Sequence, residues 1–185
     1  MIALMFGALT ASANEGKLDL TNGSTSKSVV YKMDSSARAT TIKFVDVYGT
    51  IIYSEQIENM DYSKEFSLKD LEDGVYYFIN EDALKKVTYT MRIANSEVTI
   101  LEKKEEIKPV FKQKEGMVYL NFLNRDKSPV SIEIIDSNNR SIFTEKLDNE
   151  FMVKKAFNFK KAFKDEYTIV VKDGGKAFYE SISIN

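Results

Sequence analysis

Residues 41–57 read TIKFVDVYGTIIYSEQI, and residues 131–147 read SIEIIDSNNRSIFTEKL with the same spacing of apolar and turn residues. Ile42 and Ile132 lie 90 residues apart, and matched positions lie 91 apart from Leu68 onward. A repeat of this length corresponds to a whole small domain and exceeds the ~20–50-residue period of solenoid proteins. The sequence therefore predicts two tandem domains that share one architecture.

Each half contains short segments in which apolar and polar residues alternate, separated by turn residues at intervals of roughly ten residues. This pattern is typical of an antiparallel β-sandwich, because successive side chains on a strand point to opposite faces. We therefore expect an all-β fold of two tandem seven-stranded immunoglobulin-like antiparallel β-sandwiches.

The predicted first sandwich covers residues 14–101, and the second covers residues 107–185. The charged run at residues 102–106 reads as a solvated linker between them. The sequence leaves open whether Glu97–Leu101 completes the first sandwich or begins the second.

The chain contains no histidine, no cysteine and no tryptophan. Without histidine there is no Ser-His-Asp triad and no histidine-ligated zinc. Without cysteine there is no thiol nucleophile, no disulfide and no iron–sulfur cluster. The functions that remain possible are catalysis by carboxylates, catalysis by a serine–lysine pair, and binding. We expect no cofactor.

The charged residues are nearly balanced, with 26 Lys+Arg against 28 Asp+Glu and a formal net charge of −2. They are interspersed along both halves and form no basic stripe. Because nucleic-acid binding relies on clustered positive charge, we expect no nucleic-acid partner.

The first residues resemble the end of a secretory signal peptide. Ile2–Leu9 is a short apolar run, and Thr10–Ala13 offers a small-x-small cleavage site before polar residues begin at Asn14. We therefore predict a signal peptide over residues 1–13, without its basic n-region, and export to the periplasm, cell surface or medium. The alternative is a strand or buried helix of the first sandwich. The run is far shorter than the ~20 residues of a membrane span, so we expect no transmembrane span in the mature chain.

A second pair of matched segments predicts a tyrosine corner in each sandwich. Residues 67–78 read SLKDLEDGVYYF, and residues 158–169 read NFKKAFKDEYTI. In a tyrosine corner the buried ring packs and its hydroxyl caps a backbone carbonyl a few residues upstream. We expect Tyr76 and Tyr167 to have this structural role, and ligand stacking is the alternative.

The runs VDVYGTIIYSEQI, FSLKDLEDGVYYFIN and KKVTYTMRI together resemble the type IX secretion C-terminal sorting domain. The resemblance covers Thr40–Ala94 and, more weakly, Val130–Asn185, where Asn139 takes the place of Gly49. It implies an immunoglobulin-like sandwich that an outer-membrane secretion machine reads as the tail of a cargo protein.

Carboxylate pairs at the predicted corners could suggest a glycosidase, which needs two carboxylates facing one cleft. The candidates are Asp70 with Asp73 and Asp165 with Glu166. Turn formation and solubility are the favoured explanation of these residues, because a small sandwich has little room for both a core and a cleft. We assign no catalytic residue.

Two loop clusters, Asp136–Asn139 and Asn80–Asp82, contain oxygen ligands of the kind that calcium prefers. Neither has the alternating acidic spacing that would bring several oxygens to one point. We assign no metal site.

One strand differs between the two halves in a way that suggests an interaction surface. Its outward face carries Val75, Tyr77 and Ile79 in the first half, but Glu166, Thr168 and Val170 in the second. An apolar strip on an outward sheet face can mark a contact surface, so Val75, Tyr77 and Ile79 form a candidate interaction strip. Glu97–Leu101 or the second sandwich could instead cover it, or it could be an ordinary small patch.

These observations predict a non-enzymatic exported protein, an envelope-associated or secreted binding or adhesion module with a protein or envelope component as partner. The alternative is a type IX sorting module recognised by the outer-membrane secretion machinery. An enzyme that uses facing carboxylates is the third hypothesis.

Overall fold

The computed structural model of the chain describes residues 18–33, 39–58 and 61–184. The predicted signal peptide, residues 1–13, lies outside these described residues. The described residues form strands and no helix, as expected for an all-β protein. The strands are β1 (Leu18–Asn22), β2 (Ser28–Met33), β3 (Thr40–Asp46), β4 (Ile51–Ile57), β5 (Tyr62–Ser67), β6 (Gly74–Glu81), β7 (Lys85–Ala94), β8 (Glu97–Ile107), β9 (Val110–Lys114), β10 (Met117–Leu123), β11 (Val130–Ile135), β12 (Ser141–Leu147), β13 (Met152–Asn158), β14 (Asp165–Asp173) and β15 (Lys176–Ile184).

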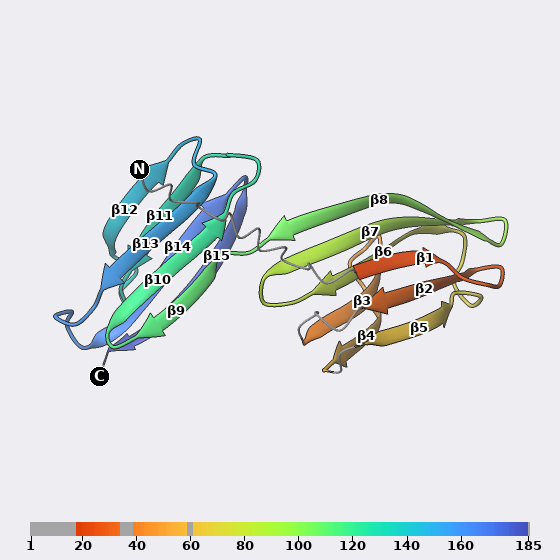
Figure 1. The fold of residues 1–185 in the computed structure, drawn as a ribbon, viewed down its shortest axis with the longest axis horizontal. Helices are drawn as coiled ribbons and strands as arrows, with labels where there is room; N and C mark the ends of the chain where they lie inside the picture. Colours follow the sequence, from red (N-terminus) through yellow and green to blue (C-terminus); the bar gives the residue numbers. More distant parts are fainter. Residues whose placement is uncertain (1–17, 34–38, 59–60, 185) are drawn as a thin grey trace, which may run out of the picture. The chain divides into compact units, whose positions relative to one another are not determined.

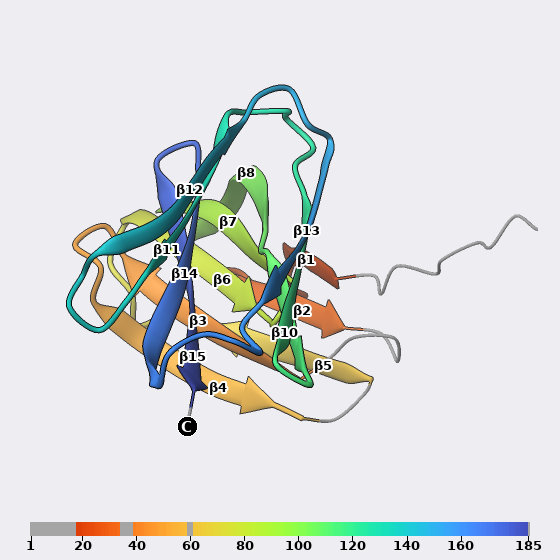
Figure 2. The same cartoon turned by 90° about the vertical axis from the view of Figure 1, so that its left-hand side faces the viewer.

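Each half of the chain is a sandwich of two antiparallel sheets (Figures 1 and 2). In the second sandwich, the order β13-β10-β9 forms one sheet and β12-β11-β14-β15 forms the other. In the first, β1-β2-β5 faces β4-β3-β6-β7-β8, which is the same arrangement with one added strand. A three-stranded sheet packed on a four-stranded sheet with these connections is an immunoglobulin-like sandwich. The predicted fold class is therefore confirmed.

The added strand explains the segment that the sequence left open. Glu97–Leu101 begins β8, which lies beside β7 in the sheet of the first sandwich. The described part of this sandwich thus has eight strands where the sequence predicted seven. The run at 102–106 is also strand rather than irregular linker, because β8 continues to Ile107.

The chain forms two compact units, and the main division between them falls between Lys103 and Lys104, within the predicted linker segment. Apart from one short segment, residues up to Lys103 belong to the first unit and residues from Lys104 belong to the second. The Glu81–Val87 segment around the β6–β7 turn groups with the second unit.

The first sandwich has a core built largely from aromatic rings. Phe78 is fully buried, and its ring centroid lies 4.9 Å from that of Phe44 and 5.0 Å from that of Tyr31. Phe66 also packs edge-on against Phe44, at 5.1 Å between ring centroids. Tilted and edge-to-face ring pairs of this kind are favourable beyond the area that they bury.

The second sandwich has a more aliphatic core. Leu120, Ile132 and Ile169 are each at most 1% exposed, and valines on the same strands fill the space between them. The alternation of buried and exposed residues on β11 produces this core, since every second side chain points inward.

The first core also contains a polar group that the second lacks. The Asn80 amide donates hydrogen bonds to the Tyr31 hydroxyl at 2.6 Å and to the Thr40 hydroxyl at 2.9 Å. The corresponding strands of the second sandwich carry Leu120, Val130 and Val171, all buried. The two sandwiches thus share a strand order but differ in the polarity of their cores.

Candidate functional site

The turn between β3 and β4 is organised by one aspartate. An Asp46 carboxylate oxygen accepts hydrogen bonds from the backbone N–H of Tyr48 at 2.9 Å and of Thr50 at 2.8 Å. These bonds, the one from Thr50 most strongly, lower the pKa of Asp46. Gly49 closes the turn with a φ of 85°, which glycine adopts without strain. This turn carries the first motif of the sorting-domain resemblance.

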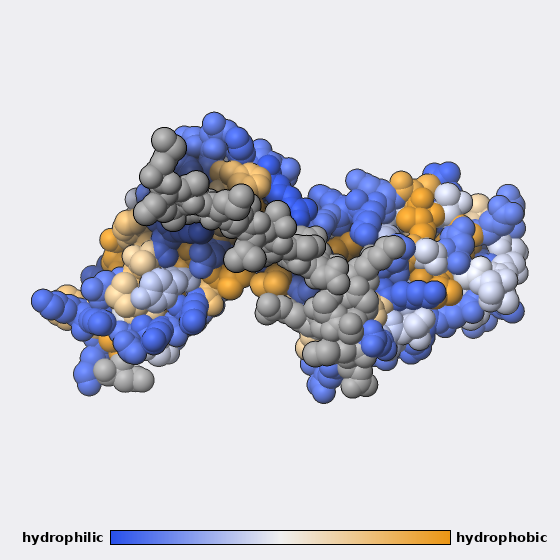
Figure 3. Space-filling view, in the orientation of Figure 1, coloured by the Kyte–Doolittle hydropathy of each residue, from blue (hydrophilic) through white to orange (hydrophobic). Residues whose placement is uncertain are grey.

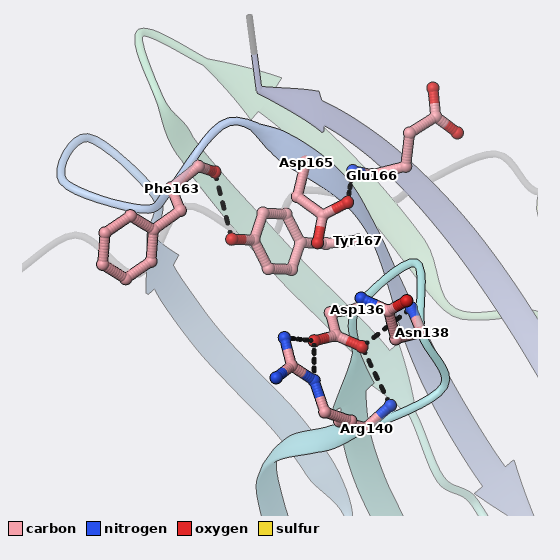
Figure 4. A network of polar contacts seen from close by, with 7 residues as sticks. All are labelled: Asp136, Asn138, Arg140, Phe163, Asp165, Glu166 and Tyr167. Atoms are coloured by element: carbon pink, nitrogen blue, oxygen red, sulfur yellow. Dashed lines mark hydrogen bonds and ion pairs between the residues drawn. The ribbon is translucent and has the colours of Figure 1, made fainter.

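The β11–β12 turn of the second sandwich has the same design (Figure 4). Asp136 accepts hydrogen bonds from the backbone N–H groups of Asn138 at 3.0 Å and Arg140 at 2.9 Å. The Arg140 guanidinium adds two contacts of 2.7 Å, and Arg140 is the main reason that the pKa of Asp136 is lowered. Asn139 takes the left-handed conformation, with a φ of 58°, in place of Gly49.

Both predicted tyrosine corners have the hydrogen bond that such a corner requires. The Tyr76 hydroxyl donates to the carbonyl of Glu72 at 3.0 Å. The Tyr167 hydroxyl donates to the carbonyl of Phe163, also at 3.0 Å (Figure 4). The Tyr167 ring is 6% exposed and packs at 5.4 Å between centroids against Phe159. These contacts give the two tyrosines a structural role.

In each sandwich the turn and the corner lie at the same end. In the second, Ser137 of the turn hydrogen-bonds the Asp165 carboxylate of the corner, and this is the main reason that the pKa of Asp165 is lowered. In the first, burial raises the pKa of Tyr76, and the nearby carboxylates of Glu72, Asp46 and Asp73 raise it further. The two motifs of the family resemblance therefore form one surface.

The carboxylates considered for catalysis take part in backbone and surface contacts at these corners. Asp73 accepts the backbone N–H of Asn95 at 2.9 Å, and Asp165 accepts that of Glu166 at 2.8 Å. Glu166 itself accepts the Ser183 hydroxyl at 3.0 Å. Among the described residues, no group of three or more acidic side chains is arranged to hold a metal ion.

The candidate interaction strip lies on β6, in the middle of the five-stranded sheet. Val75, Tyr77 and Ile79 are all half-buried. The matching positions of β14 range from exposed Glu166 to buried Val170. The strip is therefore a partly covered sheet face rather than an open apolar surface.

Four exposed apolar side chains of the first sandwich lie on the β3–β4 hairpin, which the sequence analysis did not predict as a surface. Tyr48 is 91% exposed, and Val47, Ile51 and Ile52 are 52%, 55% and 43% exposed. Apolar residues also reach the surface elsewhere on both units, among a largely hydrophilic exterior (Figure 3). The sequence did contain a signal, because two adjacent isoleucines on an edge strand cannot both face the core.

A polar cluster joins the open edges of the two sheets in the first sandwich. Lys64 on β5 contacts Glu55 on β4 at 2.8 Å and the Tyr53 hydroxyl at 2.7 Å. Tyr53 and Tyr62 both donate to the same Glu55 oxygen, Tyr62 at 2.8 Å. These bonds, led by that from Lys64, lower the pKa of Glu55 to about 2. Burial, assisted by Glu55, raises the pKa of Tyr62 to about 12.

The second sandwich repeats the ion pair without the tyrosines. Lys155 on β13 contacts Glu145 on β12 at 2.5 Å. The ring beside the pair is Phe143, which packs edge-on against Phe157 at 5.5 Å between centroids. An inward-pointing charge on an edge strand discourages pairing with foreign strands, so the ion pair protects the edges as well as joining the sheets.

Residues 24–94 match the family model of the secretion system C-terminal sorting domain. The match lies within the first sandwich and spans the β3–β4 turn, the tyrosine corner and β7. This match agrees with the family that the sequence resemblance predicted for this segment. No curated protein matches the chain.

Solved structures that match the chain include the BSP domain of a biofilm-associated protein, at 14% identity and a TM-score of 0.29, covering 91% of this chain and 29% of that one. A two-domain fibronectin type III segment of chicken tenascin gives 8% identity and a TM-score of 0.31, covering 92% of this chain and 100% of that one. The human OSCAR ligand-binding domain gives 8% identity and a TM-score of 0.26, covering 91% and 97%. Because each TM-score is below 0.5, these similarities assign no function. Over the residues that the structure describes, no helix is long and apolar enough to cross a membrane.

Proposed function

We propose that the first sandwich is an export signal, recognised as a folded surface by an outer-membrane secretion machine of type IX. The supporting observation is the family match over residues 24–94. Its two characteristic motifs meet at one end of the sandwich, where the Asp46 turn and the Tyr76 corner are adjacent. This proposed role requires no catalytic group.

The exposed β3–β4 hairpin is the surface that such a machine would contact first. Val47, Tyr48, Ile51 and Ile52 give it four exposed apolar side chains beside the corner. Exposed apolar residues at a rigid turn suit protein recognition, because they are already ordered and lose little entropy on binding.

Fusing residues 18–185 behind a periplasm-directed reporter, in a host with the type IX machine, tests this role. We expect the reporter at the cell surface or in the medium. Replacing Ile52→Glu should reduce the exported fraction several-fold, because it places a charge on the recognised hairpin. The matched change Ile142→Glu, at the corresponding and also exposed position of the second sandwich, should leave export unchanged. A reporter that stays in the periplasm contradicts the proposal.

A binding or adhesion module is the second candidate, supported by the partly covered strip on β6. Here Val75, Tyr77 and Ile79 would contact a protein or envelope component. The change Tyr77→Lys should abolish capture of that partner while the variant remains folded by circular dichroism. If Tyr77→Lys retains every partner that the wild type captures, this surface is not the site.

A further inference from the structure

The two tyrosine corners have opposite charge although they occupy the same place in their sandwiches. Residues 69–73 read KDLED, with one lysine and three carboxylates. Residues 160–164 read KKAFK, with three lysines, and the carboxylates of Asp165 and Glu166 follow directly, which leaves a net charge of +1 over residues 160–166. The charged side chains of residues 69–73 and 160–164 all belong to exposed residues. We call these segments the acidic corner and the basic corner.

Each corner also presents an aromatic ring to solvent. Tyr48, on the turn beside the acidic corner, is 91% exposed, and Phe163, within the basic corner, is 88% exposed. The carbonyl of Phe163 is held by the Tyr167 hydroxyl, so its ring projects from a fixed backbone (Figure 4). Exposed rings of this size are costly in water and are enriched where proteins associate.

Neither corner lies at the end of its sandwich where the chain passes to the other unit. The Asn95 N–H donates to Asp73, so β8 starts beside the acidic corner and runs away from it. The Phe159 N–H donates to the carbonyl of Gly116, so β9 approaches the basic corner from the opposite end of its sandwich. Each corner is thus the free end of its own unit.

We propose that the acidic corner of one molecule docks on the basic corner of a second copy of this chain. Opposite charges at the two surfaces steer and orient the encounter, and Tyr48 and Phe163 bury their rings in it. The contact joins two different surfaces, so it repeats head to tail and builds a ring or an open filament. This assembly uses the same end of the first sandwich as the proposed sorting role, but export of a fusion and association in solution are separate measurements, so the failure of one is distinguishable from the failure of the other.

Sedimentation velocity of the full chain over a range of concentrations tests the assembly. At an ionic strength of about 0.01 M, where the Debye length is about 30 Å, the sedimentation coefficient should rise with concentration. At about 1 M, where that length is about 3 Å, the association should be largely lost. A sedimentation coefficient that is independent of concentration at low salt overturns the proposal, whether the corners stay free or meet within one molecule.

Charge reversal locates the contact. The pair Lys161→Asp and Lys164→Asp should weaken association at least about tenfold, and so should Asp70→Lys with Glu72→Lys. Mixing these two variants should restore association, because each supplies the corner that the other has lost. The change Phe163→Ser should weaken association without altering its dependence on salt.

A matched control carries the same charge change away from the corner. Lys112→Asp with Lys154→Asp alters two exposed lysines on β9 and β13. This control should associate as the wild type does, to within about twofold. If it weakens association as much as the corner variants, or if the mixture remains monomeric, corner-to-corner docking is wrong.

Discussion

The two sandwiches use the same ion pair at the same edge, but only the first surrounds it with hydroxyl groups. In the first, Glu55 accepts hydrogen bonds from Lys64, Tyr53 and Tyr62. In the second, Glu145 contacts Lys155, and the adjacent ring is the hydroxyl-free Phe143. The same strand arrangement thus accommodates either an ion pair with tyrosine hydroxyl partners or an ion pair alone.

The core of the first sandwich is likewise the more polar of the two. The first core combines aromatic rings with the Asn80 amide, whereas the second is mainly aliphatic. Polar groups that are removed from water need specific partners, so the first sandwich tolerates fewer substitutions. The comparison teaches that shared topology does not fix how each copy is stabilised.

The largest expected effect is on the cores. Phe78→Ala should lower the free energy of unfolding of the first sandwich by about 4 kcal/mol, because it removes a fully buried ring that packs against Tyr31 and Phe44. The matched change Ile169→Ala should cost about 3 kcal/mol, because less volume is lost. Urea unfolding with hydrogen exchange, read separately for each unit, measures both. Equal losses would show that the aromatic core adds nothing beyond its volume.

The next effect is on the edge ion pair. Glu55→Gln should destabilise the first sandwich by about 2 kcal/mol, since three donors lose a charged acceptor. Glu145→Gln should cost about 1 kcal/mol or less, because a partly exposed ion pair is worth little alone. The same unfolding experiment applies. A larger loss for Glu145→Gln would contradict the role given to the tyrosines.

The tyrosine corners should give a smaller difference. Tyr167→Phe should lower the free energy of unfolding by about 1 kcal/mol, because it leaves the Phe163 carbonyl without the donor that the buried Tyr167 supplies. Tyr76→Phe should cost less, since Tyr76 is only half-buried and water can replace its hydroxyl. Thermal unfolding of the two variants against the wild type measures the order. If Tyr76→Phe is the more damaging, burial does not control the corner.

The smallest effect is on acid stability between about pH 5 and pH 3.5. The pKa of Glu55 falls from 4.5 in the unfolded chain to about 2 in the folded one. Its contribution is therefore complete above about pH 4.5 and is lost progressively as the pH falls from there through about 2, so the interval from pH 5 to pH 3.5 contains only the first part of the loss. The wild type should lose stability in this window more steeply than Glu55→Gln. Parallel curves for the two proteins would show that Glu55 is not the titrating group.

Strand identities could be predicted because they depend on local alternation. The pattern of Ile132, Ile134 and their neighbours fixes which side chains face inward, whatever the other sheet contains. The corners could be found for the same reason, since Tyr76 and Tyr167 bond carbonyls only four residues away. The 102–106 segment was harder, because exposed charges occur both in linkers and on edge strands such as β8.

The candidate site was only partly predictable. The residues of the interaction strip could be assigned to one face, but their half-burial depends on what lies across them. The Glu55 cluster was not found, because Tyr53 and Lys64 belong to different sheets and no local spacing relates them. The exposure of the β3–β4 hairpin was not predicted, because turn motifs indicate backbone conformation and not the exposure of the neighbouring side chains.

By itself, the sequence determined the all-β class, the two matched halves and the family of the first, since these depend on periodicity and short motifs. Only the tertiary structure decided that β8 extends the first sheet, that Glu55 and Lys64 meet across the edge, and that each turn sits beside its corner. The physical reason is that pairing between sheets and exposure to water depend on residues distant in the chain. Periodicity specifies which way a side chain points, and only the assembled sandwich specifies what it meets.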